Sequence, residues 1–149
     1  MNTANFDDPD VEEQWCEQQR IRVVEYLKIE KIDHGEIGEW PAFLVAPFVS
    51  IWAIESLKAP GWLGWWVISG DLPTDYVSAI NIKHPRDAMR SIAERWLEVA
   101  SYMERGIEHP DINIGSPLNQ LELSSLLNVR ARLLLECANN DSEWGEEYD

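Results

Sequence analysis

The chain has 149 residues with 27 acidic and 12 basic side chains, so its formal net charge at neutral pH is −15. Hydrophobic residues make up 45% of it and eight residues are tryptophan. This composition excludes a disordered acidic chain, because such chains lack the apolar side chains that offset the entropy lost on ordering. A surface of this charge repels phosphate backbones and anionic lipid headgroups, so neither nucleic acid nor a membrane is an expected partner.

The length suits one domain, and we expect a single α+β domain over residues 1–149 with an acidic segment at each end. Residues 1–19 hold six acidic side chains and residues 139–149 hold five, and neither stretch has a lysine or arginine. The N-terminal segment 1–9 and the C-terminal tail 139–149 are therefore expected to contribute strongly to the negative field. Such ends favour solubility or the steering of a basic partner, and do not point to an acidic active-site cleft.

The first predicted helix begins after Asp8, a favourable N-cap, with Pro9 at the first helical position. The turn at Asp33-His34-Gly35 predicts that this helix ends near Lys31. Its apolar residues have helical but irregular spacing, which predicts one packed face: Val11, Trp15, Cys16, Val23, Tyr26 and Leu27.

A central β-hairpin is predicted next, with strands over residues 51–57 and 62–69 joined at Pro60-Gly61. The pairing joins odd positions of the first strand to even positions of the second. One face then carries Trp52, Ile54, Leu63, Trp65 and Val67. The other carries Ile51, Ala53, Leu57, Trp62, Trp66 and Ile68. Since both faces are apolar, we expect helices on both sides of the sheet, or a partner on one side, which could be a second copy of the chain.

The remaining predicted elements are a third strand over residues 76–82 and two further helices. The helix over residues 85–105 has apolar residues at spacings of three and four and ends at Gly106. The last helix begins at Ser116-Pro117 and runs to about residue 138. Its second half is apolar nearly all round, which predicts a central helix. The expected fold is therefore a small antiparallel sheet of two or three strands packed against three helices.

We expect a cytoplasmic protein. No apolar run approaches the roughly 20 residues that span a bilayer, and residues 1–8 show neither the basic nor the apolar region of an export signal. The two cysteines, Cys16 and Cys137, fall in predicted helices near opposite ends of the chain. In a reducing compartment they are expected to be small core residues rather than a disulfide.

The run Gly70-Asp71-Leu72-Pro73-Thr74-Asp75-Tyr76 is the most distinctive stretch of the sequence. It combines with four shorter motifs: Ile51-Trp52-Ala53, Gly64-Trp65-Trp66-Val67, His84-Pro85-Arg86 and Arg95-Trp96. Together they resemble a bacterial family, the domain of unknown function numbered 4826, over about residues 15–135. The resemblance implies a bacterial origin and a small stand-alone protein. It brings no catalytic role, because no activity is assigned to that family.

Asp71 and Asp75 could place two carboxylates together at a strand exit, with Glu55, His84 or Arg86 completing an acid/base or metal site. The simpler interpretation is that Asp71 and Asp75 serve as turn and cap residues. The three histidines are isolated, and no metal-binding, nucleotide-binding or hydrolase motif occurs. We therefore expect no metal, no cofactor and no assigned catalytic residue.

The hairpin tryptophans Trp52, Trp62, Trp65 and Trp66 also allow two interpretations. Clustered indoles can build a ligand pocket or a protein-binding surface, or they can fill a core between sheet and helix. Glu55 lies on the apolar face that carries Trp62 and Trp66. A buried carboxylate there would need a counter-charge, which Arg130 or Arg132 could supply.

The function expected from these features is a noncatalytic protein-interaction or adaptor module, of a chaperone-like or immunity-protein kind. The alternative is a small-ligand binder or enzyme with an acidic site at the end of the hairpin, formed by Asp71, Asp75, His84 and Arg86. These expectations give a candidate surface of seven residues: Glu55, Trp62, Trp66, Asp71, Asp75, His84 and Arg86.

Overall fold

The computed structural model describes residues 5–106 and 120–145. The chain divides into two compact units, Met1–Pro85 and Arg86–Asp149. The N-terminal unit contains helix α1 and the strands β1 to β4, and the C-terminal unit contains most of α2, helix α3 and a short 3-10 helix. Among the described helices, none is long and apolar enough to cross a membrane.

Helix α1 (Pro9–Ile29) begins as predicted. The Asp8 side chain accepts a hydrogen bond of 2.9 Å from the backbone N–H of Asp10, and Pro9 occupies the first helical position. Five residues of the helix are buried, at the three- and four-residue spacing of one face: Trp15, Cys16, Gln19, Val23 and Leu27. One face of the helix is therefore packed, as its irregular apolar spacing indicated.

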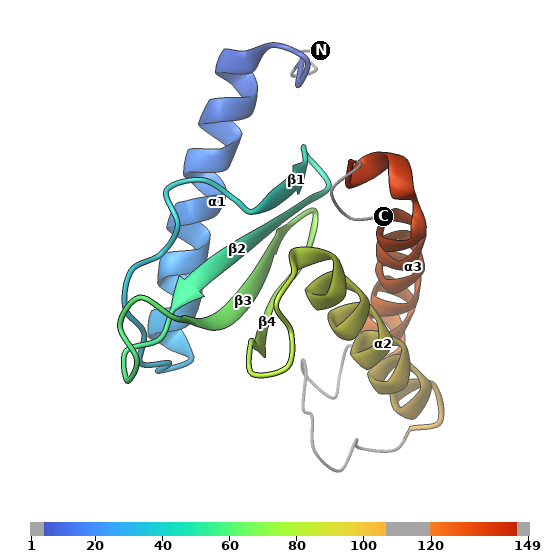
Figure 1. Cartoon of the computed structure of the whole chain (residues 1–149). Coiled ribbons are helices and arrows are strands. Elements are labelled where there is room, and N and C mark those ends of the chain that lie inside the picture. Colours follow the sequence, from blue (N-terminus) through green and yellow to red (C-terminus); the bar gives the residue numbers. More distant parts are fainter. Residues whose placement is uncertain (1–4, 107–119, 146–149) are drawn as a thin grey trace. The chain divides into compact units, whose positions relative to one another are not determined.

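The sheet of the N-terminal unit is antiparallel, with its four strands in chain order (Figure 1). The strands are β1 (Phe43–Val45), β2 (Val49–Glu55), β3 (Leu63–Gly70) and β4 (Leu72–Ser78). Between β2 and β3, Trp52 pairs with Val67 and Ala53 with Trp66, so the predicted hairpin and its odd-to-even pairing are confirmed. The number of strands was predicted as two or three and is four.

Two strands account for the difference. β1 has only three residues, too few to show a period in the sequence. β4 begins four residues earlier than the predicted third strand, because Asp71 and Asp75 were interpreted as turn and cap residues, whereas the chain turns at Asp71 alone. Gly70 pairs with Leu72 across this turn. Residue 70 must be glycine there, since a β-carbon would lie 2.2 Å from the Phe48 carbonyl oxygen.

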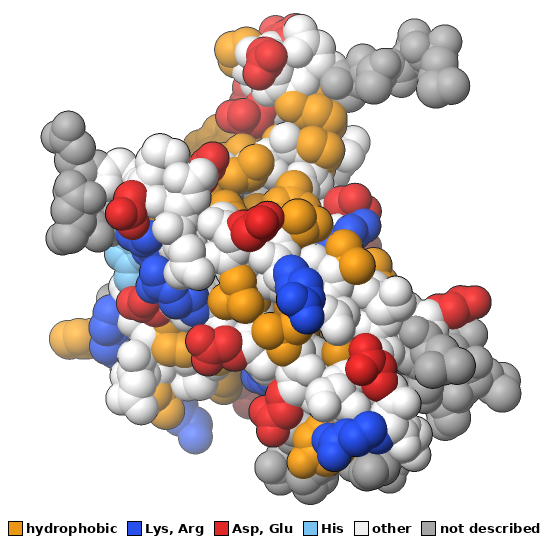
Figure 2. All heavy atoms as spheres, turned by 90° about the vertical axis from the view of Figure 1, so that its right-hand side faces the viewer, with side chains coloured by type: hydrophobic (Ala, Val, Ile, Leu, Met, Phe, Trp, Pro, Cys, Tyr) orange, Lys and Arg blue, Asp and Glu red, His pale blue; other side chains and the backbone are white. Residues whose placement is uncertain are grey.

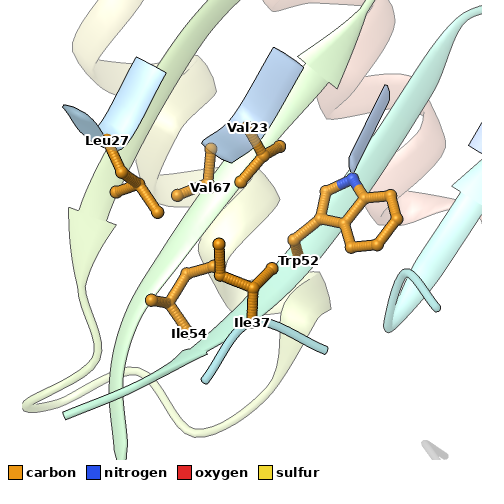
Figure 3. Packing of buried hydrophobic residues seen from close by; sticks show 6 residues of the cluster. All are labelled: Val23, Leu27, Ile37, Trp52, Ile54 and Val67. Atoms are coloured by element: carbon orange, nitrogen blue, oxygen red, sulfur yellow. The ribbon is translucent and has the colours of Figure 1, made fainter. Parts of the chain in front are cut away.

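The core of the N-terminal unit lies between α1 and one face of the sheet (Figure 3). Val23 and Leu27 of α1 point towards Trp52 and Val67 of the sheet, all of them buried. Ile37 and Ile54 complete the cluster, and Trp65 packs against it. This is the first of the two apolar faces predicted for the hairpin.

The second predicted face is only partly correct. Ile51, Trp66 and Ile68 are buried. Leu57 and Trp62, however, are 55% and 73% exposed. They do not belong to the face, because β2 ends at Glu55 and β3 begins at Leu63, which leaves both residues in the β2–β3 loop, residues 56–62.

A buried polar chain joins α1 to the sheet beside this core. The Ser69 hydroxyl donates to the side-chain oxygen of Gln19, and the Ser50 hydroxyl donates to the Ser69 carbonyl at 3.0 Å. The indole N–H of Trp52 then donates to the Ser50 hydroxyl at 2.9 Å. Ser50 and Ser69 are directly opposite in the ladder. Because buried polar groups destabilise a fold unless they are paired, this chain specifies how α1 lies on the sheet.

In the C-terminal unit, α2 (Pro85–Glu104) follows the prediction. Its six predicted apolar positions are all buried: Met89, Ile92, Ala93, Trp96, Ala100 and Met103. Gly106 follows the helix with a positive φ of 69° and donates its N–H to the Met103 carbonyl at 3.0 Å. A left-handed glycine of this kind is a common helix terminator.

Helix α3 (Gln120–Asn139) differs from the predicted central helix. Its buried residues form one stripe at spacings of three and four: Ser124, Leu127, Ala131, Leu134 and Ala138. Leu126, Val129 and Leu133 are exposed, so the helix is amphipathic and not buried all round. The Ser124 hydroxyl donates to the Ala100 carbonyl at 3.1 Å, which joins α3 to α2. The predicted helix start at Ser116-Pro117 lies outside the described residues.

Charged side chains of both signs are interspersed with apolar ones on the face drawn in Figure 2, rather than gathered by sign. The face drawn in Figure 2 therefore shows no patch of like charge that would indicate a binding site. The candidate site described below is a cavity in the N-terminal unit.

Candidate functional site

A cavity of about 560 Å³ opens in the N-terminal unit beside the C-terminal end of α1. Three segments line it: residues 30–33 after the helix, residues 56–58 of the β2–β3 loop, and positions on or near β3 and β4. Figure 1 shows the end of α1 beside the β2–β3 loop.

Aromatic rings form the inner wall of the cavity. The Trp65 and Tyr76 rings meet edge to face, with centroids 5.7 Å apart and an interplanar angle of 75°. Tyr26 of α1 contacts Tyr76 from the other side, at 6.1 Å between centroids. Both lining rings are half-buried, so each is fixed by packing while it still borders the open space.

One side of the cavity is the turn that ends α1. The N–H of Ile32 donates to the Leu27 carbonyl at 3.0 Å, and the N–H of Lys31 donates to the Lys28 carbonyl at 3.2 Å. This is a Schellman motif, whose left-handed position is usually glycine. Here it is Lys31, with φ of 57°. A strained backbone is thus placed at a residue that lines the cavity.

Glu55 connects the two loops that border the cavity. One carboxylate oxygen accepts the backbone N–H of Glu36 at 2.8 Å, in the α1–β1 loop (residues 30–42). The other accepts the backbone N–H of Gly61 at 2.7 Å, in the β2–β3 loop. These two hydrogen bonds hold the pKa of the Glu55 carboxyl below its usual value. A carboxylate bound in this way acts as a clamp between the loops.

The expected ion pair of Glu55 with Arg130 or Arg132 would join the two units and stays a prediction. Within the N-terminal unit, the carboxylate has its partners in backbone amides. Residue 55 is also half-buried rather than fully buried, because β2 ends there and the face does not continue beyond it.

The two candidate tryptophans have different environments. Trp62 is exposed in the β2–β3 loop, beside the segment that lines the cavity. Trp66 is buried, and its indole N–H donates to the Ile82 carbonyl at 2.8 Å. Trp66 therefore has a structural contact, while Trp62 presents an indole to solvent.

The acidic run after β3 forms a strand instead of the expected turn. Asp71 occupies the β3–β4 turn, where its N–H donates to the Phe48 carbonyl at 2.9 Å. Asp75 lies within β4, buried, with its carboxylate accepting the N–H of Tyr76 at 2.8 Å. Asp71 directly precedes Leu72, the first residue of β4. The three strand residues from Leu72 to Asp75 span about 10 Å of extended chain, so the two aspartates lie at least that far apart along the backbone. Local geometry does not bring the two carboxylates together.

Arg86 belongs to the C-terminal unit, where it closes the end of α3. Its guanidinium donates to the Ala138 carbonyl at 2.6 Å and to the Asp141 carboxylate at 2.5 Å. It also lies 5.8 Å from the centroid of the Trp144 ring, whose N–H donates to the Cys137 carbonyl. These contacts involve one of the carbonyls that a helix end leaves without an internal partner. His84, half-buried, precedes α2 at the end of the N-terminal unit.

Within residues 5–106 and 120–145, no group of three or more His, Cys, Asp or Glu side chains is placed to hold a metal ion. His109 lies outside these residues.

None of the seven candidate residues from the sequence lines the cavity, whose lining includes Lys31, Trp65, Tyr76 and Ile80. Trp65 was placed on the same face as Trp52 and Val67, and the hairpin tryptophans were interpreted either as part of a binding site or as core residues. The left-handed backbone of Lys31 gave no signal, since lysine is an ordinary residue for a helix end.

The fold and cavity define an α+β protein with a four-stranded antiparallel sheet and an aromatic-lined recess at the end of its first helix. The model of the family described as Domain of unknown function (DUF4826) matches residues 10–144, and the chain belongs to this family. The resemblance identified from the sequence motifs is thereby confirmed. No curated protein and no solved structure matches the chain.

Proposed function

We propose that the protein is a noncatalytic interaction module that binds a segment of a partner protein in the cavity at the end of α1. The observation that carries the proposal is the apolar rim of that cavity: Leu57 and Ile80 line it and are 55% and 76% exposed. Exposed apolar side chains around a recess with aromatic walls are typical of protein-binding surfaces. A volume of about 560 Å³ suits a few side chains of such a segment.

The roles of the other candidates support binding over catalysis. Asp75 accepts the N–H that follows it in its own strand, and Arg86 closes the end of α3. Residues engaged in this way stabilise the fold, and their hydrogen bonds would have to break before they could act on a substrate.

We place this module in the cytoplasm. Cys16 and Cys137 are free thiols, as suits a reducing compartment. Burial raises the pKa of both, that of Cys137 to about 11, which keeps them protonated and poorly reactive.

Site-specific photo-crosslinking tests the proposal. A photoreactive amino acid is introduced at Leu57 or Ile80 of the full chain in its native host, and at Ile21 as a control, because Ile21 is 60% exposed on α1 but does not line the cavity. We expect the same partner to be captured from both cavity positions and not from the control.

The captured partner is then purified and its affinity measured directly. Leu57→Ser with Ile80→Ser should weaken binding by about tenfold or more, and Ile21→Ser should leave it within about twofold. Equal affinities for the two variants, or adducts independent of position, would contradict the proposal. A protein that binds a small molecule and forms no protein adduct would favour the alternative.

A further inference from the structure

The proposed function leaves the chemistry of the partner open. Resting on that function, we infer that the cavity receives a cationic side chain, arginine or lysine, presented by the partner between apolar neighbours. Three features of the cavity lead to this inference: its aromatic wall, the charge around it and its apolar rim.

The aromatic wall supplies a surface that attracts cations. A guanidinium or ammonium group within about 6 Å of a Trp or Tyr ring centroid is drawn to the negative face of the ring. Trp65 and Tyr76 are held edge to face, so their planes differ by 75° and two differently oriented rings border one space. The chain uses this interaction elsewhere, since the Arg105 guanidinium lies 4.7 Å from the centroid of Tyr102.

The net charge of the N-terminal unit favours the same class of ligand, while the cavity lining itself holds two acidic and two basic side chains. Glu30 and Asp33 line the side formed by the end of α1, and a helix C-terminus carries a partial negative charge. The N-terminal unit as a whole has 14 acidic and six basic residues, a net charge of −8. A field of this sign raises the local concentration of cationic groups and repels anionic ones.

Lys31 and Lys58 also line the cavity, and they make an anionic side chain the rival ligand. Their ammonium groups end long flexible stems at exposed positions, so they can turn to solvent when a cation enters. The rings of Trp65 and Tyr76 cannot leave in the same way, because both pack against the core of the unit. The part of the lining that cannot move, the Trp65 and Tyr76 rings, therefore favours a cationic ligand over an anionic one.

The rim specifies the neighbours of the cationic residue. Leu57 and Ile80 are exposed apolar side chains from two separate segments of the lining, one from the β2–β3 loop and one from the chain after β4. A segment with leucine beside its arginine or lysine would cover both. The complementary partner is therefore an amphipathic basic segment, rather than a uniformly basic one.

Blocked peptides of one design test this chemistry on the full-length protein. The probes are acetyl-Gly-Leu-X-Leu-Gly-amide with X as arginine, lysine, norleucine or glutamate, titrated by isothermal calorimetry and followed by the NMR shifts of the Trp65 indole. We expect the arginine and lysine peptides to bind roughly tenfold more tightly than norleucine, and the glutamate peptide to bind least.

Charge variants of the protein give the matched control. Glu30→Gln with Asp33→Asn should weaken binding of the arginine peptide by about fivefold, and Lys31→Gln with Lys58→Gln should strengthen it. Glu13→Gln with Glu17→Gln removes the same two negative charges from exposed positions in the first half of α1. Because these positions do not line the cavity, this control should change binding by less than about twofold.

The outcomes separate this inference from the function on which it rests. If the norleucine peptide binds as tightly as the arginine peptide and its binding shifts the Trp65 indole, the cavity binds segments but does not select a cation. If the glutamate peptide binds best and loss of the two lysines abolishes its binding, the ligand is anionic. Absence of binding by all four peptides at millimolar concentration also overturns the inference. The crosslinks from Leu57 and Ile80 test the proposed function independently of all three.

Discussion

Gly35 lies so close to Glu55 that a β-carbon at residue 35 would stand 2.1 Å from a carboxylate oxygen of Glu55. The same oxygen accepts the N–H of Glu36, so the absence of a side chain at residue 35 is what lets the carboxylate reach its partner. The clamp between the two cavity loops therefore depends on a glycine in one loop and an acid at the end of β2.

This relationship makes the effects of two substitutions non-additive. Gly35→Ala should lower the melting temperature of the wild-type chain by a few degrees, because the Glu55 carboxylate must move. In a Glu55→Ala background the clashing atom is absent, so the same substitution should change the melting temperature little. Thermal unfolding of the four variants in the cycle measures the coupling. Equal effects in both backgrounds would show that the clamp does not depend on this contact.

The lowered pKa of Glu55 predicts a pH dependence of stability. Because the folded pKa lies below the ordinary value of 4.5, the clamp contributes its full stabilisation above pH 4.5 and loses it as pH falls through the folded pKa. The difference in melting temperature between wild type and Glu55→Gln should therefore shrink as pH falls below 4.5. Glu39→Gln, an exposed control in the same unit, should show no matching trend. If the melting-temperature difference between wild type and Glu55→Gln grew as the pH fell, the Glu55 carboxylate would not stabilise the fold in its charged form.

Lys31 predicts a substitution that stabilises the fold. Its φ of 57° is unfavourable for a residue with a side chain, so Lys31→Gly should raise the free energy of unfolding by about 0.5–1 kcal/mol. Lys28→Gly, inside α1, provides the control and should lower it by about 1 kcal/mol. Urea unfolding measures both changes. A loss of stability for Lys31→Gly would mean that the lysine side chain contributes more than the strain removes.

The buried hydrogen bonds that link Gln19 to Trp52 through two serines predict that the Ser69 hydroxyl is important for stability. Ser69→Ala removes the donor to the Gln19 side chain, which is itself buried, and should lower the free energy of unfolding by about 1–3 kcal/mol. Ser125→Ala, at an exposed position of α3, should change it by less than about 0.5 kcal/mol. Denaturant unfolding compares the two. Similar small effects would show that the Gln19 side chain finds another partner.

The ion pair between Arg86 and Asp141 is unequally buried, so substitutions of its two residues should lower the free energy of unfolding by different amounts. The Arg86 side chain is 11% exposed and Asp141 is 76% exposed. Arg86→Ala should lower the free energy of unfolding by about 2 kcal/mol, because the Ala138 carbonyl loses the shorter of its two hydrogen bonds and keeps only the one from Arg90 at 3.2 Å. Asp141→Asn should lower it by less than about 1 kcal/mol, since exposed pairs contribute little. Hydrogen exchange at the end of α3 should follow the same order, and equal effects would assign the stability to the ion pair.

Local signals predicted a large part of the fold. Asp8-Pro9 indicated the start of α1, and the alternation of apolar residues indicated that Trp52 and Val67 share a face of the hairpin, because cap chemistry and strand period act over a few residues. β1 and β4 were missed or displaced where the signal was short or ambiguous. Gly70 and Pro73 suggest a turn in isolation, but Gly70 is required by the Phe48 carbonyl, a contact that no local pattern records.

The cavity could not be predicted in the same way. It depends on where α1 ends relative to Trp65 and Tyr76, two aromatic residues that the sequence places far from the helix. Glu55 was a candidate for its charge among apolar residues, and within the N-terminal unit its carboxylate has two partners that the sequence did not indicate: the amides of Glu36 and Gly61. Main-chain donors are available at every residue, so composition does not identify them.

The two hydrogen bonds of Glu55 have a consequence for the kinetics of association. Loops that are ordered only on binding slow the formation of a complex and reduce its affinity. Here the Glu55 carboxylate links both loops in the folded chain, together with backbone hydrogen bonds such as that from the Glu55 N–H to the Glu36 carbonyl at 2.9 Å, so a partner encounters an entrance that is already formed. Removing that carboxylate should therefore act mainly on the rate of association, while substitutions of Leu57 or Ile80 act mainly on the lifetime of the complex.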